Sequence, residues 1–139
     1  MTDPKMLTPE LHALLFITAA TLLMWVPYVL ARIVKRGLLG AMANPGPNDV
    51  PLPAWADRAK QAHLNGIENL AIFAPAVLIA AAIGLSTHTM AVWAWTYVAA
   101  RLVHYVVYTA GIPIVRTLAF VLGFVATLSI VIALIPHAM

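Results

Sequence analysis

The fold is decided by residues 58–101, which read RAKQAHLNGIENLAIFAPAVLIAAAIGLSTHTMAVWAWTYVAAR. After Glu68 this stretch holds no charged side chain until Arg101, and beyond it only Arg116 interrupts the run to the C-terminus. A charged side chain held in hydrocarbon is costly, so such residues usually face the interior of a bundle or a cavity. We therefore expect Glu68 and Arg101 to mark a functional site.

The composition is that of a membrane protein. Of the 139 residues, 63% are hydrophobic and 9% are charged, and the mean hydropathy is +0.91, whereas a soluble domain carries about 25% charged residues. The net charge of +3 is small and scattered, which argues against nucleic-acid binding. The chain has no cysteine, so any thiol chemistry must use a thiol from outside.

Four segments are long enough to cross a bilayer, which takes about 20 apolar residues. They predict an all-α membrane protein, a four-transmembrane-helix up-down bundle in a single domain over residues 1–139. The helices are expected at about residues 10–34, 58–84, 90–111 and 113–135, with a cytoplasmic loop at about residues 36–57. The uncharged run of the first helix is too long for a removable signal peptide.

Prolines divide these segments further. Between Gly37 and Asp57 the chain has four prolines and three glycines, which predicts an irregular connection because proline lacks an amide donor and fixes φ. Pro27 lies inside the first helix and is expected to kink it, with a neighbouring helix or a threonine hydroxyl accommodating the freed carbonyl group.

The basic residues predict the orientation of the bundle. Five of them flank the first connection, namely Arg32, Lys35, Arg36, Arg58 and Lys60. The hairpin near residues 86–89 has none. The positive-inside rule places the first connection in the cytoplasm, and the third connection lies on the same side. Both termini then face away from the cytoplasm.

Two stripes of polar residues follow helical spacing. The second-helix stripe consists of Arg58, Gln61, Asn65 and Glu68, and the third-helix stripe consists of Tyr97, Arg101, His104 and Tyr108. Residues three or four apart share a helix face, so we expect two antiparallel helices to bring these faces together. One interpretation is structural, with a Glu–Arg pair and polar neighbours holding the helices together. Eight polar side chains exceed that need and favour a solvated binding site.

Such a site suits a small zwitterionic molecule that enters from the cytoplasm. Arginine binds carboxylates in bidentate fashion, Asn65 and Gln61 suit amides, and Glu68 suits an ammonium group. Tyr108 and Arg116 are placed to donate to a thiolate, because a cation or hydroxyl donor makes a thiol nucleophilic at neutral pH. A lipophilic second substrate would enter from the bilayer.

These residues resemble the MAPEG family, the membrane-associated proteins in eicosanoid and glutathione metabolism. The segment from Arg58 to Asn69 is similar to the Asn-x-x-Glu segment of that family, and the run from Arg101 to Tyr108, followed by Arg116, is similar to its third-helix run. The resemblance covers most of the chain and is closest to the short bacterial branch.

The resemblance implies a left-handed bundle that assembles as a homotrimer in a bacterial inner membrane, with glutathione as co-substrate between subunits. It implies that Arg116, with Tyr108, stabilises the thiolate. The implied glutathione-binding residues are Arg36, Arg58, Gln61, Asn65, Glu68, Arg101 and His104. The family usually has an arginine at the position of Gln61. Glutamine can donate a hydrogen bond to a carboxylate but brings no charge.

The expected function is that of a glutathione-dependent membrane enzyme, which conjugates glutathione to lipophilic electrophiles or reduces lipid hydroperoxides. Two alternatives stay open. One is a non-catalytic lipid-binding or scaffold protein of the same fold, and the other is a small multidrug exporter that uses Glu68. No metal site is expected, because no ligand spacing such as His-Glu-x-x-His occurs.

Overall fold

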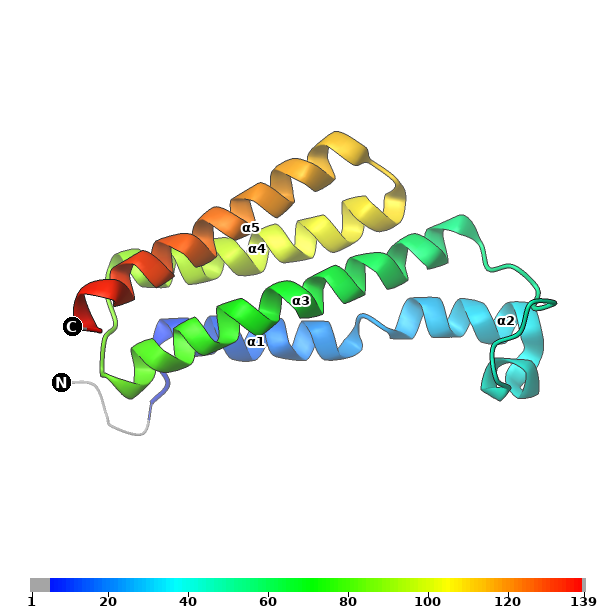
Figure 1. Cartoon of the computed structure of the whole chain (residues 1–139), viewed down its shortest axis with the longest axis horizontal. Coiled ribbons are helices and arrows are strands. Elements are labelled where there is room, and N and C mark those ends of the chain that lie inside the picture. Colours follow the sequence, from blue (N-terminus) through cyan, green and yellow to red (C-terminus); the bar gives the residue numbers. More distant parts are fainter. Residues whose placement is uncertain (1–5, 139) are drawn as a thin grey trace.

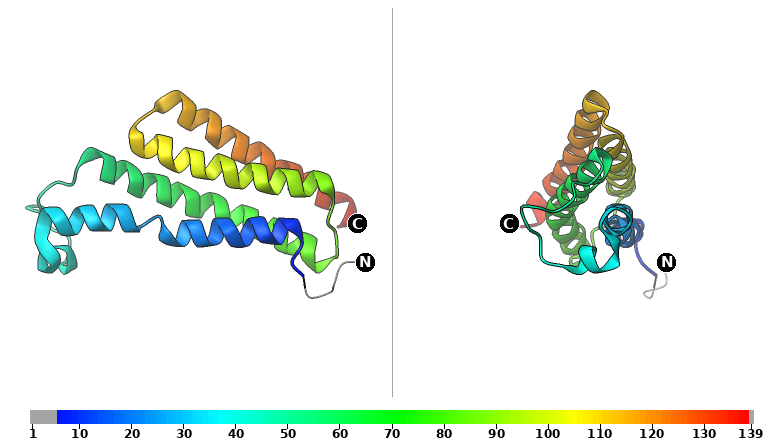
Figure 2. Two further views of the ribbon diagram at one scale, coloured as in Figure 1. Left: turned by 180° about the vertical axis from the view of Figure 1, so that it is seen from behind. Right: turned by 90° about the vertical axis from the view of Figure 1, so that its right-hand side faces the viewer.

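The computed structural model describes residues 6–138 as helices joined by tight turns and one longer loop (Figure 1). The elements are α1 (Pro9–Leu23), α2 (Val26–Met42), α3 (Ala54–Ala82), α4 (His88–Ala110), α5 (Pro113–Leu134) and the short 3-10 helix η1 (Ile135–His137). Because α2 continues α1, the bundle has four rods that run up and down beside one another (Figures 1 and 2). No strand occurs within residues 6–138, so the all-α prediction is confirmed.

Three stretches within the described residues are long and apolar enough to span a membrane. They are Pro9–Met42, Ala54–Ala82 and Pro113–His137. Helix α4 has 23 residues and lies among these rods (Figure 1). Arg101 and His104 make it less apolar than its neighbours, and both side chains are buried within the bundle rather than facing lipid.

The first rod is interrupted where the sequence predicts a kink. Helix α1 ends at Leu23 and α2 begins at Val26, with Pro27 in the first turn of α2. The carbonyl group of Met24 accepts a hydrogen bond of 2.9 Å from the hydroxyl of Tyr105 on α4. A neighbouring helix thus satisfies a backbone group exposed by the break, as membrane burial requires.

The loop expected over residues 36–57 is shorter than predicted. Helix α2 continues to Met42 across Gly37, whose φ of 69° and ψ of 168° turn the chain sharply. No proline lies between Gly37 and Met42, so a further helical turn forms there. Helix α3 begins at Ala54, directly after Pro53, which is the N-cap residue and has an extended ψ of 143°. The irregular stretch is therefore residues 43–53.

Small residues and stacked rings form the core. The rings of Phe73 on α3 and Tyr97 on α4 lie 3.8 Å apart between centroids at an interplanar angle of 6°. Around them pack alanines that are almost fully buried, among them Ala13, Ala80, Ala94 and Ala126. Small residues let helix backbones approach closely, which is how helices pack where water supplies no hydrophobic drive.

The ends of α4 are fixed by local chemistry. Thr87 caps its start, where its hydroxyl accepts from the Met90 amide at 3.1 Å. Gly111 ends it with a φ of 81°, which only glycine adopts easily.

The turn at Gly111 and loop 43–53 lie at one end of the bundle, and α1 begins at the opposite end, where α5 also terminates (Figure 1). The positively flanked connections therefore share one end, as predicted.

Candidate functional site

Arg101 lies inside the bundle and is the centre of the polar contacts. It is 3% exposed. Its Nη2 donates to Oδ1 of Asn65 at 2.7 Å and lies 3.3 Å from Nδ1 of His104. The structural interpretation expected a neutralising pair between Arg101 and Glu68. The described residues contain no such pair, because Glu68 is exposed on the outside of α3.

Two donors of Arg101 are buried without a protein acceptor among residues 6–138. They are Nε and Nη1, and the buried hydroxyl of Tyr97 likewise has no partner there. Buried polar groups in proteins are almost always hydrogen-bonded, and an uncompensated buried charge is strongly unfavourable. The interior around Arg101 is therefore suited to water or to an anionic group.

Gly123 of α5 makes the space for this arginine. An added Cβ at this position would lie 3.4 Å from Cδ of Arg101 and 3.9 Å from the ring of Tyr97. Gly66 of α3 faces the guanidinium from the other side, with the corresponding distance to Nη2 at 4.0 Å. Neither glycine was predicted to be part of the site. Their signal was a glycine inside a helical segment, which often has a packing reason.

His104, Tyr108 and Arg116 form a second cluster at the end of the bundle. The rings of His104 and Tyr108 meet edge to face with centroids 5.5 Å apart. The guanidinium carbon of Arg116 lies 4.4 Å from the centroid of the Tyr108 ring. These three side chains, with Thr117 and Phe120, line an open hollow of about 250 Å³. Because His104 also contacts Arg101, the two clusters are continuous.

Arg58 caps the end of α4. Its Nε donates to the carbonyl oxygen of Thr109 at 3.0 Å. Its guanidinium group packs against Gly111, where an added Cβ would come within 3.3 Å. A cation is favourable at a helix C-terminus because the last carbonyl groups carry partial negative charge. In this chain Arg58 therefore acts on the turn that leads to Arg116, and not on the hollow itself.

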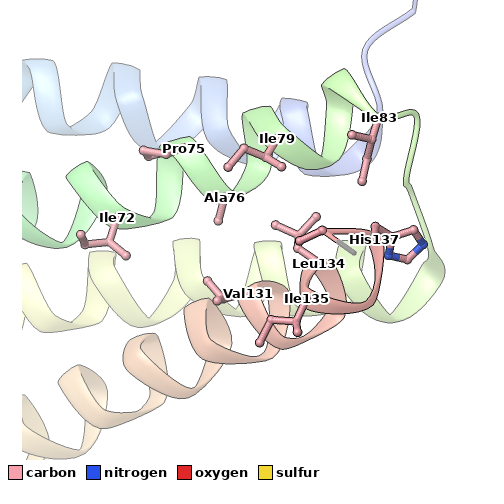
Figure 3. Close-up of a pocket in the computed structure, with 10 residues that line it drawn as sticks. Ile72, Pro75, Ala76, Ile79, Ile83, Val131, Leu134, Ile135 and His137 are labelled. Carbon is pink, nitrogen blue, oxygen red and sulfur yellow. The ribbon is translucent and has the colours of Figure 1, made fainter.

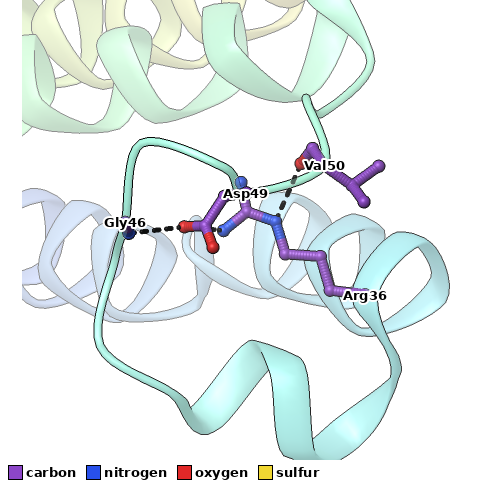
Figure 4. Close-up of polar contacts among 4 residues, drawn as sticks. All are labelled: Arg36, Gly46, Asp49 and Val50. Atoms are coloured by element: carbon purple, nitrogen blue, oxygen red, sulfur yellow. Dashed lines mark hydrogen bonds and ion pairs between the residues drawn. The ribbon is translucent and has the colours of Figure 1, made fainter.

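Arg36 lies apart from both clusters. It forms an ion pair of 3.0 Å with Asp49 and donates from Nε to the carbonyl oxygen of Val50 at 2.9 Å (Figure 4). Asp49 also accepts from the Gly46 amide at 3.0 Å. Arg36 thus orders the loop after α2.

The second-helix stripe divides into two rows. Arg58 and Asn65, seven residues apart, face α4 and make the contacts described above. Gln61 and Glu68, also seven residues apart, point outward and are exposed. A step of three residues along a helix falls about 60° short of a full turn. The four residues of the stripe therefore spread around α3, and two of them lie outside its contact with α4.

Two buried polar pairs were not predicted as functional or structural sites. His63 on α3 is 8% exposed, and its Nδ1 lies 2.8 Å from the hydroxyl of Tyr28 on α2. Glu10 on α1 is 2% exposed and accepts from the Ser86 hydroxyl at 2.9 and 3.1 Å. In the sequence Glu10 is a charged residue that flanks the first apolar segment, so its burial was not predicted.

An apolar groove runs between α3 and α5. One part, of about 370 Å³, is lined by α3 from Ile72 to Ile83 and by the end of the chain from Val131 to Ala138 (Figure 3). A second hollow of about 330 Å³ shares Ile72 and Val131 with it and extends to Asn69. The amide of Asn69 donates to the Asn65 backbone at 2.8 Å, so the groove ends next to the polar site.

The fold and the site together define a class of protein: an integral membrane helical bundle with a cationic and aromatic site inside one end. A comparison with family models gives the family. The MAPEG family model matches residues 11–135, and the chain belongs to this family. Its function lies in general within membrane glutathione-related or lipid metabolism. No curated protein matches the chain.

Proposed function

We propose that this protein is a membrane enzyme that binds glutathione and uses its thiolate against lipophilic electrophiles or lipid hydroperoxides. The observation that carries the proposal is the hollow lined by His104, Tyr108 and Arg116, in which a fixed cation and a phenol hydroxyl border the same space. Family membership supports glutathione as the thiol.

The charges around the site match those of glutathione. This tripeptide carries two carboxylates, an ammonium group and a thiol. Arg101 offers two unpartnered donors to a carboxylate within the described part of the chain, and Asn65 offers an amide next to it. Glu68, exposed on the next turn of α3, is available to an ammonium group. Gln61 offers a neutral donor two turns before Glu68.

Arg116 and Tyr108 activate the thiol in this proposal. The guanidinium of Arg116 stabilises the thiolate, which lowers the pKa of the glutathione thiol. The thiolate sulfur then attacks an electrophilic carbon, a carbon–sulfur bond forms, and the leaving group departs with the displaced electron pair. With a hydroperoxide, the sulfur attacks the outer oxygen and the O–O bond breaks. The alkoxide then takes a proton, and a second glutathione reduces the sulfenic acid to a disulfide and water.

The groove between α3 and α5 supplies a route for the lipophilic partner. Its lining is mostly aliphatic, and it reaches Asn69, one turn from Asn65. A bilayer-dissolved molecule can therefore approach the polar site without crossing water. The outward row of Gln61 and Glu68 further supports a homotrimer, in which a neighbouring subunit covers these side chains and completes the site.

Thiolate formation tests the proposal directly. Purified protein with glutathione is expected to show the ultraviolet absorbance of a thiolate and turnover of a generic electrophile. Arg116→Ala should lose both, and Arg116→Lys should keep part of the absorbance because it keeps the charge. Arg32→Ala, an arginine outside the hollow, is the matched control. If Arg116→Ala retains the thiolate band and full turnover, the role of Arg116 is refuted.

A second function is favoured by Gln61 and by the length of the apolar groove. A protein that only binds or presents lipids needs the groove and not the thiolate site. Lipid binding in the absence of any glutathione binding or glutathione-dependent turnover would identify this function.

The exporter hypothesis rests on Glu68 alone, and proton-coupled efflux abolished by Glu68→Gln would support it.

A further inference from the structure

The groove between α2 and the start of α3 differs from the lipid-facing surface around it. It has a volume of about 470 Å³ and is lined by Pro27, Leu30, Ala31, Val34, Lys35, Pro53 and Trp55. The floor is apolar over about 10 Å of α2, from Pro27 to Val34. Lys35 follows Val34 and is the charged residue of the lining, and Trp55 lines the groove from α3.

The direction of the chain after Lys35 indicates that this residue lies near the membrane–water interface. Two residues later, Gly37 turns α2 aside with a φ of 69°, and the segment after it leaves the axis of the bundle (Figures 1 and 2). Leu38, Leu39 and Met42 in this segment are 60%, 84% and 75% exposed. A short apolar turn that runs across the end of a membrane bundle suits the membrane–water interface, as does Trp55.

Lys35 and Arg32 are the cations of α2 that have no ion pair within residues 6–138. Arg36, its neighbour, is held by Asp49 and Val50. Lys35 is exposed and has no ion pair within residues 6–138. Arg32 lies three residues earlier, close to the same helix face, and likewise has no carboxylate partner in that part of the chain. The groove thus joins an acyl-sized apolar floor to uncompensated positive charge at headgroup depth.

We infer that the α2–α3 groove is a binding site for an anionic phospholipid, with an acyl chain along Pro27, Leu30 and Val34 and the phosphate at Lys35. A cation near an anionic membrane surface favours binding by roughly fivefold. A zwitterionic lipid gains less, because its own ammonium group opposes Lys35. The site is separate from the hollow at Arg116 and does not depend on the proposed enzymatic activity.

Native mass spectrometry of the full-length protein in detergent tests this inference. The protein is titrated with phosphatidylglycerol and with phosphatidylcholine of the same acyl chains. The wild type is expected to retain phosphatidylglycerol about fivefold more strongly. Lys35→Gln should remove this preference, whereas Lys60→Gln, an exposed lysine at the same end outside the groove, should leave it intact.

A second variant separates the groove from surface charge. Val34 is 83% exposed, so Val34→Trp is tolerated in folding and fills the groove; it should reduce retention of phosphatidylglycerol while Lys35 stays present. Unchanged preference in Lys35→Gln overturns the inference, as does an equal loss in Lys60→Gln. If Val34→Trp instead dissociates an oligomer and leaves lipid preference unchanged, a second copy of the chain occupies the groove and the lipid site is refuted.

Discussion

The guanidinium carbon of Arg116 lies 4.4 Å from the centroid of the Tyr108 ring, so a residue at the start of α5 is held by the last turn of α4. The planar cation stacks on the aromatic face, an attraction of about 0.5–2 kcal/mol. This contact holds the guanidinium group of Arg116 at the edge of the hollow that His104 also lines.

Two substitutions of Tyr108 separate its ring from its hydroxyl. Tyr108→Phe keeps the surface under Arg116 and removes a donor to the thiolate, so kcat/KM with glutathione and an electrophile should fall about tenfold or more. Tyr108→Leu also removes the ring and should lower kcat/KM further. Steady-state kinetics measure both. Equal activity of the leucine variant and the wild type would exclude any role for Tyr108 in positioning Arg116.

Arg58 and Gly111 should act together on stability. Arg58→Ala removes a charge-assisted hydrogen bond to the Thr109 carbonyl group, which should lower the free energy of unfolding by about 2 kcal/mol. Gly111→Ala should destabilise as well, because its φ is 81° and the added Cβ meets Arg58. Lys60 is exposed on α3, the helix that carries Arg58, so Lys60→Ala is the control. Unfolding in mixed micelles that is unchanged by Arg58→Ala would contradict the capping role.

The space at Gly123 sets the size of side chain that α5 tolerates beside Arg101. Gly123→Ala brings a Cβ to 3.4 Å from Arg101, which is ordinary contact, so glutathione binding should change little. Gly123→Leu should displace the arginine and weaken glutathione binding at least about tenfold, since a desolvated charged contact is lost. Calorimetric titration distinguishes the two variants. A leucine variant that binds normally would show that Arg101 is not part of the site.

Glu10 and Ser86 join the start of α1 to the α3–α4 turn at the end far from Arg116. Ser86→Ala leaves the buried carboxylate without its hydroxyl partner and should lower the free energy of unfolding by about 1–3 kcal/mol. Glu10→Gln keeps a side chain that can accept from Ser86 and should cost less. Thermal unfolding of the two variants is the measurement. The opposite order of stability would mean that the charge of Glu10 matters more than the hydrogen bond.

Gln61 is an exposed position at which charge can be restored. Gln61→Arg adds a cation on the outward row of α3, two turns before the exposed Glu68, and should raise glutathione affinity by up to about fivefold, the upper end for a solvated ion pair. Gln61→Leu, which removes the donor, should lower the affinity. Dissociation constants from titration decide the point. If both variants bind as the wild type does, Gln61 lies outside the glutathione site.

Several features followed from local sequence alone. The break before Pro27 and the end of α4 at Gly111 depend on backbone restrictions of single residues, which act wherever the chain places them. The start of α3 was predicted four residues late, at Arg58 rather than Ala54. Trp55 and the alanines around it carry no periodic signal, so the sequence does not predict the helix start at Ala54.

The sequence by itself determined that the chain is a helical membrane protein and that polar residues recur at helical spacing, because hydropathy and a period of 3.6 residues are local properties. Only the tertiary structure decided which of these residues meet. The rotation of each helix about its own axis brings Asn65, and not Glu68, to Arg101, and it turns Gln61 outward. That rotation is set by the packing of Phe73, Tyr97 and Gly123 across three helices, contacts that no single segment encodes.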